Sequence, residues 1–160
     1  MNSALKILYG FLFFITGCLI YIMVRPEAPY LLFSAQTEIF MNLPGFIKYS
    51  SPAFFHCTAM ILISAPFISN KKYSVYKLAF FWVLIEIIFE TGQKYSSFIE
   101  SILNDHYFFY MINYFNKGTF DPADIGMSVA GGIVGIIILN LLHANKFDFK
   151  DLQKGKKHVS

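Results

Sequence analysis

Charged residues are scarce in this chain of 160 residues. Lysine, arginine, aspartate and glutamate together make up 14% of it, against roughly 25% in an ordinary soluble domain. The mean hydropathy is +0.51, and 56% of the residues are hydrophobic, with 19 phenylalanines and 10 tyrosines among them. This composition is typical of an integral membrane protein, and the length suits one compact bundle.

Cysteine is scarce too. Cys18 and Cys57 both lie inside apolar runs, which excludes a disulfide framework and favours small buried side chains. No internal repeat is present. The stretch "KGTFDPADIG" is not a phosphate-binding loop, because it lacks the Gly-Lys-Ser/Thr ending of such loops. We therefore expect no cofactor.

Four segments are apolar enough to cross a bilayer, for which a helix needs about 20 residues, within a range of roughly 17 to 25. They are residues 5–24, 53–69, 76–91 and 124–143, the second of them beginning after Pro52. The sequence thus predicts an all-α, polytopic membrane helix bundle with four transmembrane helices. Residues 1–145 would form this single domain, and residues 146–160 a basic cytoplasmic tail.

The first apolar segment has a second interpretation. "ITGC", residues 15–18, has the form of a lipoprotein cleavage box. However, "LIYIMV" continues the apolar run beyond Cys18, where a lipoprotein would become polar, so a retained span is favoured.

The positive residues predict the orientation. Cytoplasmic loops of membrane proteins carry the excess of lysine and arginine. Nine positive residues fall at the amino end, between the second and third spans, or in the tail: Lys6, Lys71, Lys72, Lys77, Lys146, Lys150, Lys154, Lys156 and Lys157. The other two loops hold only Arg25, Lys48, Lys94 and Lys117. We expect a multi-pass membrane protein with both termini cytoplasmic, and a tail that meets anionic lipid rather than nucleic acid.

Residues 92–123 would form an outer loop. Its part 98–115, "FIESILNDHYFFYMINYF", is rich in tyrosine and phenylalanine, which favour the membrane–water interface. We expect one or two short helices lying in that interface. A fifth span is the alternative, but it would put the basic tail on the opposite side from that predicted by the charge distribution.

Acidic residues inside the third apolar segment require an explanation, because carboxyl groups in a membrane usually face a partner or a water-filled cavity. Glu86, Glu90 and Gln93 have the spacing i, i+4, i+7 and therefore share one helix face. His56 on the second segment, and Asp121 and Asp124 at the start of the fourth, lie at a similar predicted depth. These six residues predict an outward-facing polar pocket, with Glu86 at its floor.

Simpler roles remain open for some of these residues. Asp121 and Asp124 are well placed to cap the fourth helix, and a lone histidine such as His56 is often a satisfied core residue. Glu86 lies too deep to reach water, so it needs a partner or a proton. We interpret His56 as that partner.

Small residues recur on the fourth segment: Ser128, Gly131, Gly132 and Gly135. Small side chains let helices approach closely in lipid. We interpret this stripe as helix packing next to Asp124.

Three stretches resemble the VanZ-like family of small bacterial membrane proteins: "PAFFHCTAM" (52–60), "FWVLIEIIFETGQ" (81–93) and "YFNKGTFDPADIGMSVAGG" (114–132). They resemble most a branch with PxFxH, ExxQ and GTFDPxD elements. The resemblance implies a four- or five-helix bundle in the bacterial inner (cytoplasmic) membrane, and it maps the family's motif residues onto Glu90, Gln93 and Asp124, followed by Gly131. Ser128 stands where the family often has asparagine, and Thr119 where many members have arginine.

The function expected from these features is that of a cell-envelope membrane protein whose pocket binds or handles a lipid-linked or envelope substrate. A link to glycopeptide susceptibility rests on the resemblance alone. One alternative is a structural or accessory subunit of a larger membrane complex, with a protein partner or a second copy as its neighbour. The other is a metal-dependent membrane hydrolase, but only one histidine is present at the site and no nucleophile pair is apparent. The expected partner is membrane lipid, and no catalytic residue is predicted.

Overall fold

The computed structural model describes the main chain of residues 3–24, 44–69, 71–102 and 108–156, and their side chains except those of residues 24, 72, 114 and 144–156. Within these ranges the chain is all-α, as predicted. The helices are α1 (Ser3–Val24), α3 (Gly45–Ser64), α4 (Lys72–Lys94), α5 (Ser96–Ile102), α6 (Phe109–Lys117) and α7 (Pro122–Lys156), with a short 3₁₀ helix, η1 (Ala65–Phe67), after α3.

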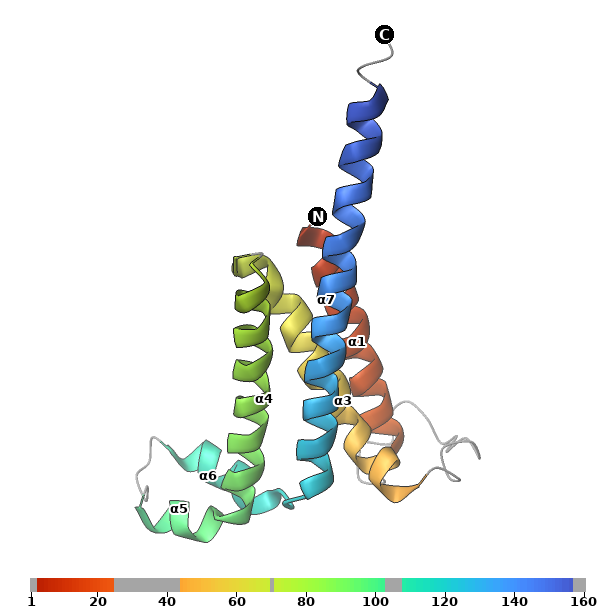
Figure 1. Ribbon diagram of the computed structural model, residues 1–160. Coiled ribbons are helices and arrows are strands. Elements are labelled where there is room, and N and C mark those ends of the chain that lie inside the picture. The colour runs from red at the N-terminus through yellow and green to blue at the C-terminus, as the bar shows by residue number, and fades with distance from the viewer. Residues whose placement is uncertain (1–2, 25–43, 70, 103–107, 157–160) are drawn as a thin grey trace.

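Four long helices, α1, α3, α4 and α7, run between two ends of the molecule (Figure 1). The beginning of α1, the turn from α3 to α4 and the end of α7 lie at one end, here called the tail end. The end of α1, the short helices α5 and α6 and the beginning of α7 lie at the other, here called the cavity end. The central helix is α3, which packs against α1, α7 and α4.

Two of the four predicted spans pass a test of length and apolarity. Within the described residues, Ser3–Met23 and Pro122–His143 are the two helical stretches long and apolar enough to cross a membrane. Of the other two helices, α3 is enclosed by its neighbours and α4 carries two glutamates. The fold class is therefore all-helical with two candidate spans, and the four-span arrangement remains a prediction.

The start of α3 was predicted wrongly. The sequence suggested a helix beginning after Pro52, but α3 begins at Gly45 and Pro52 lies inside it. Proline lacks the N–H that would bond the carbonyl four residues earlier, at Lys48. The Ser51 hydroxyl donates to the Lys48 carbonyl oxygen at 3.5 Å, a long hydrogen bond that replaces part of the one that is lost.

The other long helices extend beyond their predicted ends. α4 covers Lys72–Lys94 rather than 76–91. α7 begins at Pro122 and continues past His143 to Lys156. The predicted boundary between residues 145 and 146 thus falls inside one continuous helix, because charged residues that end an apolar span need not end the helix.

The predicted outer loop contains two short helices, α5 and α6. Their lengths are 7 and 9 residues, well below the roughly 17 that a spanning helix needs. The alternative of a fifth span through residues 98–115 therefore finds no support in the described part of this loop. Its position at the membrane interface remains a prediction.

The apolar core lies in the tail half of the bundle, where α3, α4 and α7 meet. It consists of Cys57, Ile61, Leu62, Ala65, Val75, Ala79 and Leu139, each no more than 3% exposed. Nearby, the Trp82 indole N–H donates to the Ser64 hydroxyl at 3.2 Å. Cys57 is buried as predicted, but Cys18 is exposed on α1, so the expectation of two buried cysteines is half wrong.

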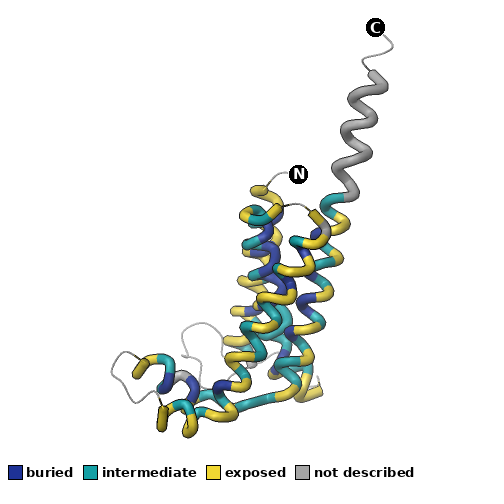
Figure 2. Tube along the Cα trace, turned by 60° about the vertical axis from the view of Figure 1, so that its left-hand side comes forward, coloured by how far each residue is buried: buried dark blue, intermediate teal, exposed yellow. Residues whose placement is uncertain are grey.

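The outer sides of the long helices are largely apolar and exposed (Figure 2). Examples come from three helices: Phe11 and Leu12 on α1, Phe80 and Ile88 on α4, and Ile133 and Leu141 on α7. Each of these side chains is more than half exposed. Soluble monomers rarely expose apolar side chains continuously over such lengths.

Candidate functional site

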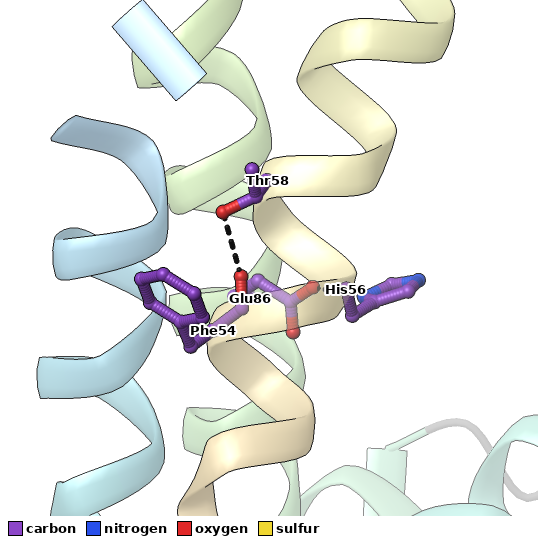
Figure 3. A network of polar contacts seen from close by, with 4 residues as sticks. All are labelled: Phe54, His56, Thr58 and Glu86. Carbon is purple, nitrogen blue, oxygen red and sulfur yellow. Dashed lines mark hydrogen bonds and ion pairs between the residues drawn. The ribbon is translucent and has the colours of Figure 1, made fainter. Parts of the chain in front are cut away.

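His56 and Glu86 form a direct polar contact between α3 and α4. The distance from His56 Nδ1 to Glu86 Oε1 is 2.5 Å. The Glu86 side chain is 16% exposed and the His56 side chain 46%, so the carboxyl group is the more enclosed of the two. Figure 3 shows both side chains, with His56 on α3 and Glu86 on α4 behind it. The predicted pairing is confirmed, and Glu86 has the partner that its depth requires.

Glu90 reaches the start of α7 instead. Its Oε2 accepts a hydrogen bond from the main-chain N–H of Asp121, with an N–O distance of 3.2 Å. Glu90 lies one helical turn beyond Glu86, on the same face of α4. The two acids on one face of α4 therefore contact different neighbours: Glu86 contacts α3, and Glu90 contacts the start of α7.

Asp121 also caps α7, as the simpler interpretation proposed. Its Oδ1 accepts from the Ala123 N–H at 2.9 Å, and its carbonyl oxygen accepts from the Asp124 N–H at 3.0 Å. Pro122 then occupies the first helical position, where its missing N–H costs nothing. Asp124 lies in the first turn of α7, where the helix dipole stabilises a negative charge.

α3 and α7 approach closely at Gly131. A Cβ placed on Gly131 would lie 2.4 Å from the Phe54 carbonyl oxygen, so no larger residue fits without movement of the main chain. The Thr58 hydroxyl lies 2.9 Å from the Phe54 carbonyl oxygen and 3.0 Å from that of Gly131, and it can donate its single proton to either one. Figure 3 shows Thr58 and the bond to Phe54 on the side of α3 that faces α7.

The other small residues of the stripe also lie between helices. A Cβ on Gly132 would be 2.8 Å from Val83 of α4, and one on Gly135 would be 3.1 Å from Ile61 of α3. Ser128 is 1% exposed. α7 therefore lies against α3 and α4 together, and this packing brings Asp124 close to α4.

α6 is held against the cavity end of α4 by Phe115. This side chain is 5% exposed; its ring lies 5.9 Å from that of Phe89, and a Cβ on Gly92 would be 2.7 Å from it. α5 and α6 are joined by a hydrogen bond from Asn116 Nδ2 to Glu100 Oε2 at 3.0 Å. Three further residues of α6, Tyr110, Asn113 and Lys117, line the cavity described next.

A cavity of about 780 Å³ opens between these elements at the cavity end. Three carboxyl groups line it, those of Glu90, Asp121 and Asp124. The other polar lining residues are Gln93, Asn113, Lys117 and Thr119, and three tyrosines complete the wall: Tyr21, Tyr49 and Tyr110. Among the described lining residues, acidic side chains thus outnumber basic ones by three to one.

The predicted six-residue pocket is divided in the structure. Glu90, Gln93, Asp121 and Asp124 line the cavity, whereas His56 and Glu86 are absent from its lining. His56 instead lines a second hollow of about 430 Å³ between α1 and α3, here called the groove. Four of the six predicted residues thus line one hollow, because the i, i+4 spacing gives a shared helix face but not a shared surface.

Several lining residues were missed by sequence reasoning. Lys117 and Thr119 flank Gly118, and a Cβ on Gly118 would be 2.5 Å from the Gln93 side chain. Their position in the sequence, directly before the "FDP" turn, could have identified them as lining residues. Asn113 and the three tyrosines gave none, because their contribution depends on how α1, α3 and α6 pack around α4 and α7.

Among the described residues, no three histidine, cysteine, aspartate or glutamate side chains come close enough together to hold a metal ion. Glu90 and Asp121 already accept main-chain hydrogen bonds, and His56 faces Glu86.

Comparison of the chain with protein-family models, with curated protein sequences and with solved structures finds no match.

Proposed function

We propose that this chain is a four-span membrane protein of the cell envelope, and that its cavity binds the polar part of a lipid-linked or other envelope substrate on the outer side. The observation that carries the proposal is the cavity itself. It brings Glu90, Asp121 and Asp124 together with Lys117 in a hollow of about 780 Å³, a size within the usual range for ligand sites.

The membrane assignment is supported by the exterior of the bundle. Two helices have the length and apolarity of spans, and α4 exposes Phe80, Phe81 and Ile88 although its glutamates lower its overall apolarity. Those glutamates face neighbouring helices rather than the exterior, since Glu86 contacts α3 and Glu90 contacts α7. Polar residues of a transmembrane helix are expected to face the bundle interior in this way.

The distribution of lysines supports the orientation. Lys71 and Lys77 lie at the tail end, to which the lysine-rich end of α7 also runs. The cavity end has fewer positive residues. By the positive-inside rule the tail end is cytoplasmic and the cavity opens outward. We retain the resemblance to VanZ-like proteins as part of the proposal.

Native mass spectrometry of the protein extracted gently from its own membrane tests this function. Wild type is compared with Glu90→Gln/Asp124→Asn, which removes two carboxylates and leaves the volume of the side chains nearly unchanged. We expect wild type to carry a bound small molecule that the double variant has lost. Glu100→Gln is the matched control, because this exposed acid on α5 lies outside the cavity lining.

An accessory subunit is the second candidate function. α5 and α6 expose large apolar side chains, among them Phe98 at 64%, Ile102 at 63% and Phe109 at 58%. These could contact a protein partner as well as the membrane interface. A protein that copurifies in fixed ratio with both wild type and the double variant, without any small ligand, would favour this second function over the first.

A further inference from the structure

The groove and the cavity share a wall. Tyr21 of α1, and Pro52 and Ala53 of α3, line both hollows. The two hollows therefore adjoin at these three residues.

The two hollows differ in chemistry. Apart from the shared wall, the groove is lined by Phe14, Gly17, Cys18 and Ile22 of α1 and by His56 of α3. Four of these five residues offer no charged or strongly polar group, and His56 is engaged with Glu86. The groove therefore suits hydrocarbon, whereas the cavity is lined by carboxyl, amide and hydroxyl groups.

The direction of the groove also fits a lipid chain. α1 runs from the tail end to the cavity end, so Ile22 lies nearer the cavity end of the helix than Phe14 does. At a rise of 1.5 Å per residue, the distance from Phe14 to Ile22 along the helix is about 12 Å. The groove thus descends from the cavity along the helix axis, which is the direction of acyl chains in a bilayer.

The lining of the cavity selects against an anionic head group. Ionised phosphate accepts hydrogen bonds but donates none. Among the described lining residues it would face three carboxyl groups and one basic group, Lys117. Hydroxyl groups, in contrast, donate to carboxylates and exchange hydrogen bonds with the amides of Gln93 and Asn113. Tyr21, Tyr49 and Tyr110 add flat apolar faces with a polar edge.

We propose that the ligand is a single amphiphile whose uncharged, hydroxyl-rich head group lies in the cavity and whose hydrocarbon chain lies along the α1–α3 groove. This inference rests on the proposed function of the cavity and adds the class of the ligand and the place of its apolar part. Tyr21, Pro52 and Ala53 mark the junction between head group and chain.

The test uses the purified protein in detergent, titrated with a defined lipid and observed by native mass spectrometry. The probe is monoglucosyl diacylglycerol, and the comparison lipid is phosphatidylglycerol with the same acyl chains. We expect the glucosyl lipid to bind at least about tenfold more tightly than the anionic lipid, a difference of about 1.4 kcal/mol or more.

Two variants separate the groove from the cavity. Ile22→Trp fills the groove and leaves the cavity lining intact, and Leu19→Trp is its control, because Leu19 is 47% exposed on α1 but does not line the groove. We expect Ile22→Trp and Glu90→Gln/Asp124→Asn each to weaken glucosyl lipid binding by about tenfold or more, and Leu19→Trp to bind as wild type does. Cys18→Phe, which fills the same groove from the next turn, replaces Ile22→Trp if the latter fails to fold.

The outcomes are distinguishable. If Ile22→Trp and Cys18→Phe bind the glucosyl lipid as wild type does while the acid double variant has lost it, the groove is not the chain site, although the proposed function of the cavity stands. If the acid double variant also binds normally, both proposals fail. Tighter binding of phosphatidylglycerol, or of a cationic lipid with the same chains, overturns the head-group class.

Discussion

His56 of α3 and Glu86 of α4 are joined by a contact of 2.5 Å between Nδ1 and Oε1. This contact links the central helix to the neighbour with which it shares the tail-end core. It also removes Glu86 from the set of groups available to a ligand. The polar residues of the bundle thus divide into a structural pair and a separate cavity.

The structural pair should be visible in a double-mutant cycle. His56→Ala and Glu86→Ala are each expected to destabilise the protein, and the double variant should lose less than the sum. Hydrogen bonds between transmembrane helices contribute about 0.6 kcal/mol on average and at most about 1.7, so we expect a coupling of about 1 kcal/mol. The measurement is denaturant unfolding in detergent. As a control, the losses in free energy of unfolding from Thr16→Ala and Glu86→Ala should add, since the Thr16 hydroxyl donates its proton to the Leu12 carbonyl oxygen. A coupling of zero between His56 and Glu86 would contradict the structure.

Gly131 and Gly126 form a matched pair on α7. Gly131→Ala places a Cβ 2.4 Å from the Phe54 carbonyl oxygen, and such overpacking typically costs about 1–3 kcal/mol. Gly126→Ala meets nothing within 4 Å, so alanine's higher helix propensity should stabilise the protein by up to about 1 kcal/mol. Thermal unfolding of the two variants should give shifts of opposite sign. Equal shifts would show that α3 and α7 are farther apart than described.

Asp121 should act mainly through its side-chain cap. Asp121→Ala loses the bond to the Ala123 N–H, and loss of such a cap costs about 0.5–2 kcal/mol. Asp121→Asn retains an acceptor oxygen and should lose only a small part of this. Unfolding of both variants measures the difference, and a loss in Asp121→Asn as large as in Asp121→Ala would point to a role for the charge itself.

The proposed orientation predicts which positions can be labelled from outside. With Cys18 replaced by serine, Ser97→Cys on α5 should react with a membrane-impermeant maleimide on intact cells. Ser69→Cys, in the turn between α3 and α4, should react only after permeabilisation. Both serines are exposed in the structure, so burial does not explain a difference. Labelling of both positions from the same side of the membrane would contradict the proposal that α4 crosses it.

The sequence was sufficient to predict the all-helical class. It was also sufficient to predict which polar groups on different helices lie at similar heights along the bundle. Apolar runs identified α1 and α7, and the i, i+4 spacing put Glu86 and Glu90 on one face of α4. The pairing of Glu86 with His56 followed from their similar depth. Helix ends were less accurate. α3 passes through Pro52, and the contact of the Ser51 hydroxyl with the Lys48 carbonyl oxygen is a local replacement that composition does not reveal.

The division of the polar residues between cavity and groove could not be predicted. It depends on how α3 is rotated about its own axis relative to its neighbours. That rotation is set by contacts between residues distant in sequence, such as Gly17 of α1 with Phe55 and Gly131 of α7 with Phe54. The tyrosines of the cavity wall come from three separate helices for the same reason. Spacing along one helix gives a face, whereas a binding surface requires the neighbouring helices.

The bond between Glu90 and Asp121 has a consequence for how the site can vary. Glu90 accepts from the main-chain N–H of Asp121, a donor present in every amino acid except proline. The link between α4 and the start of α7 is therefore independent of the side chain at position 121. Changes at this position can alter the charge of the cavity or the cap of α7 while α4 and the start of α7 stay joined. The side chains that line the cavity can therefore vary without loss of this hydrogen bond.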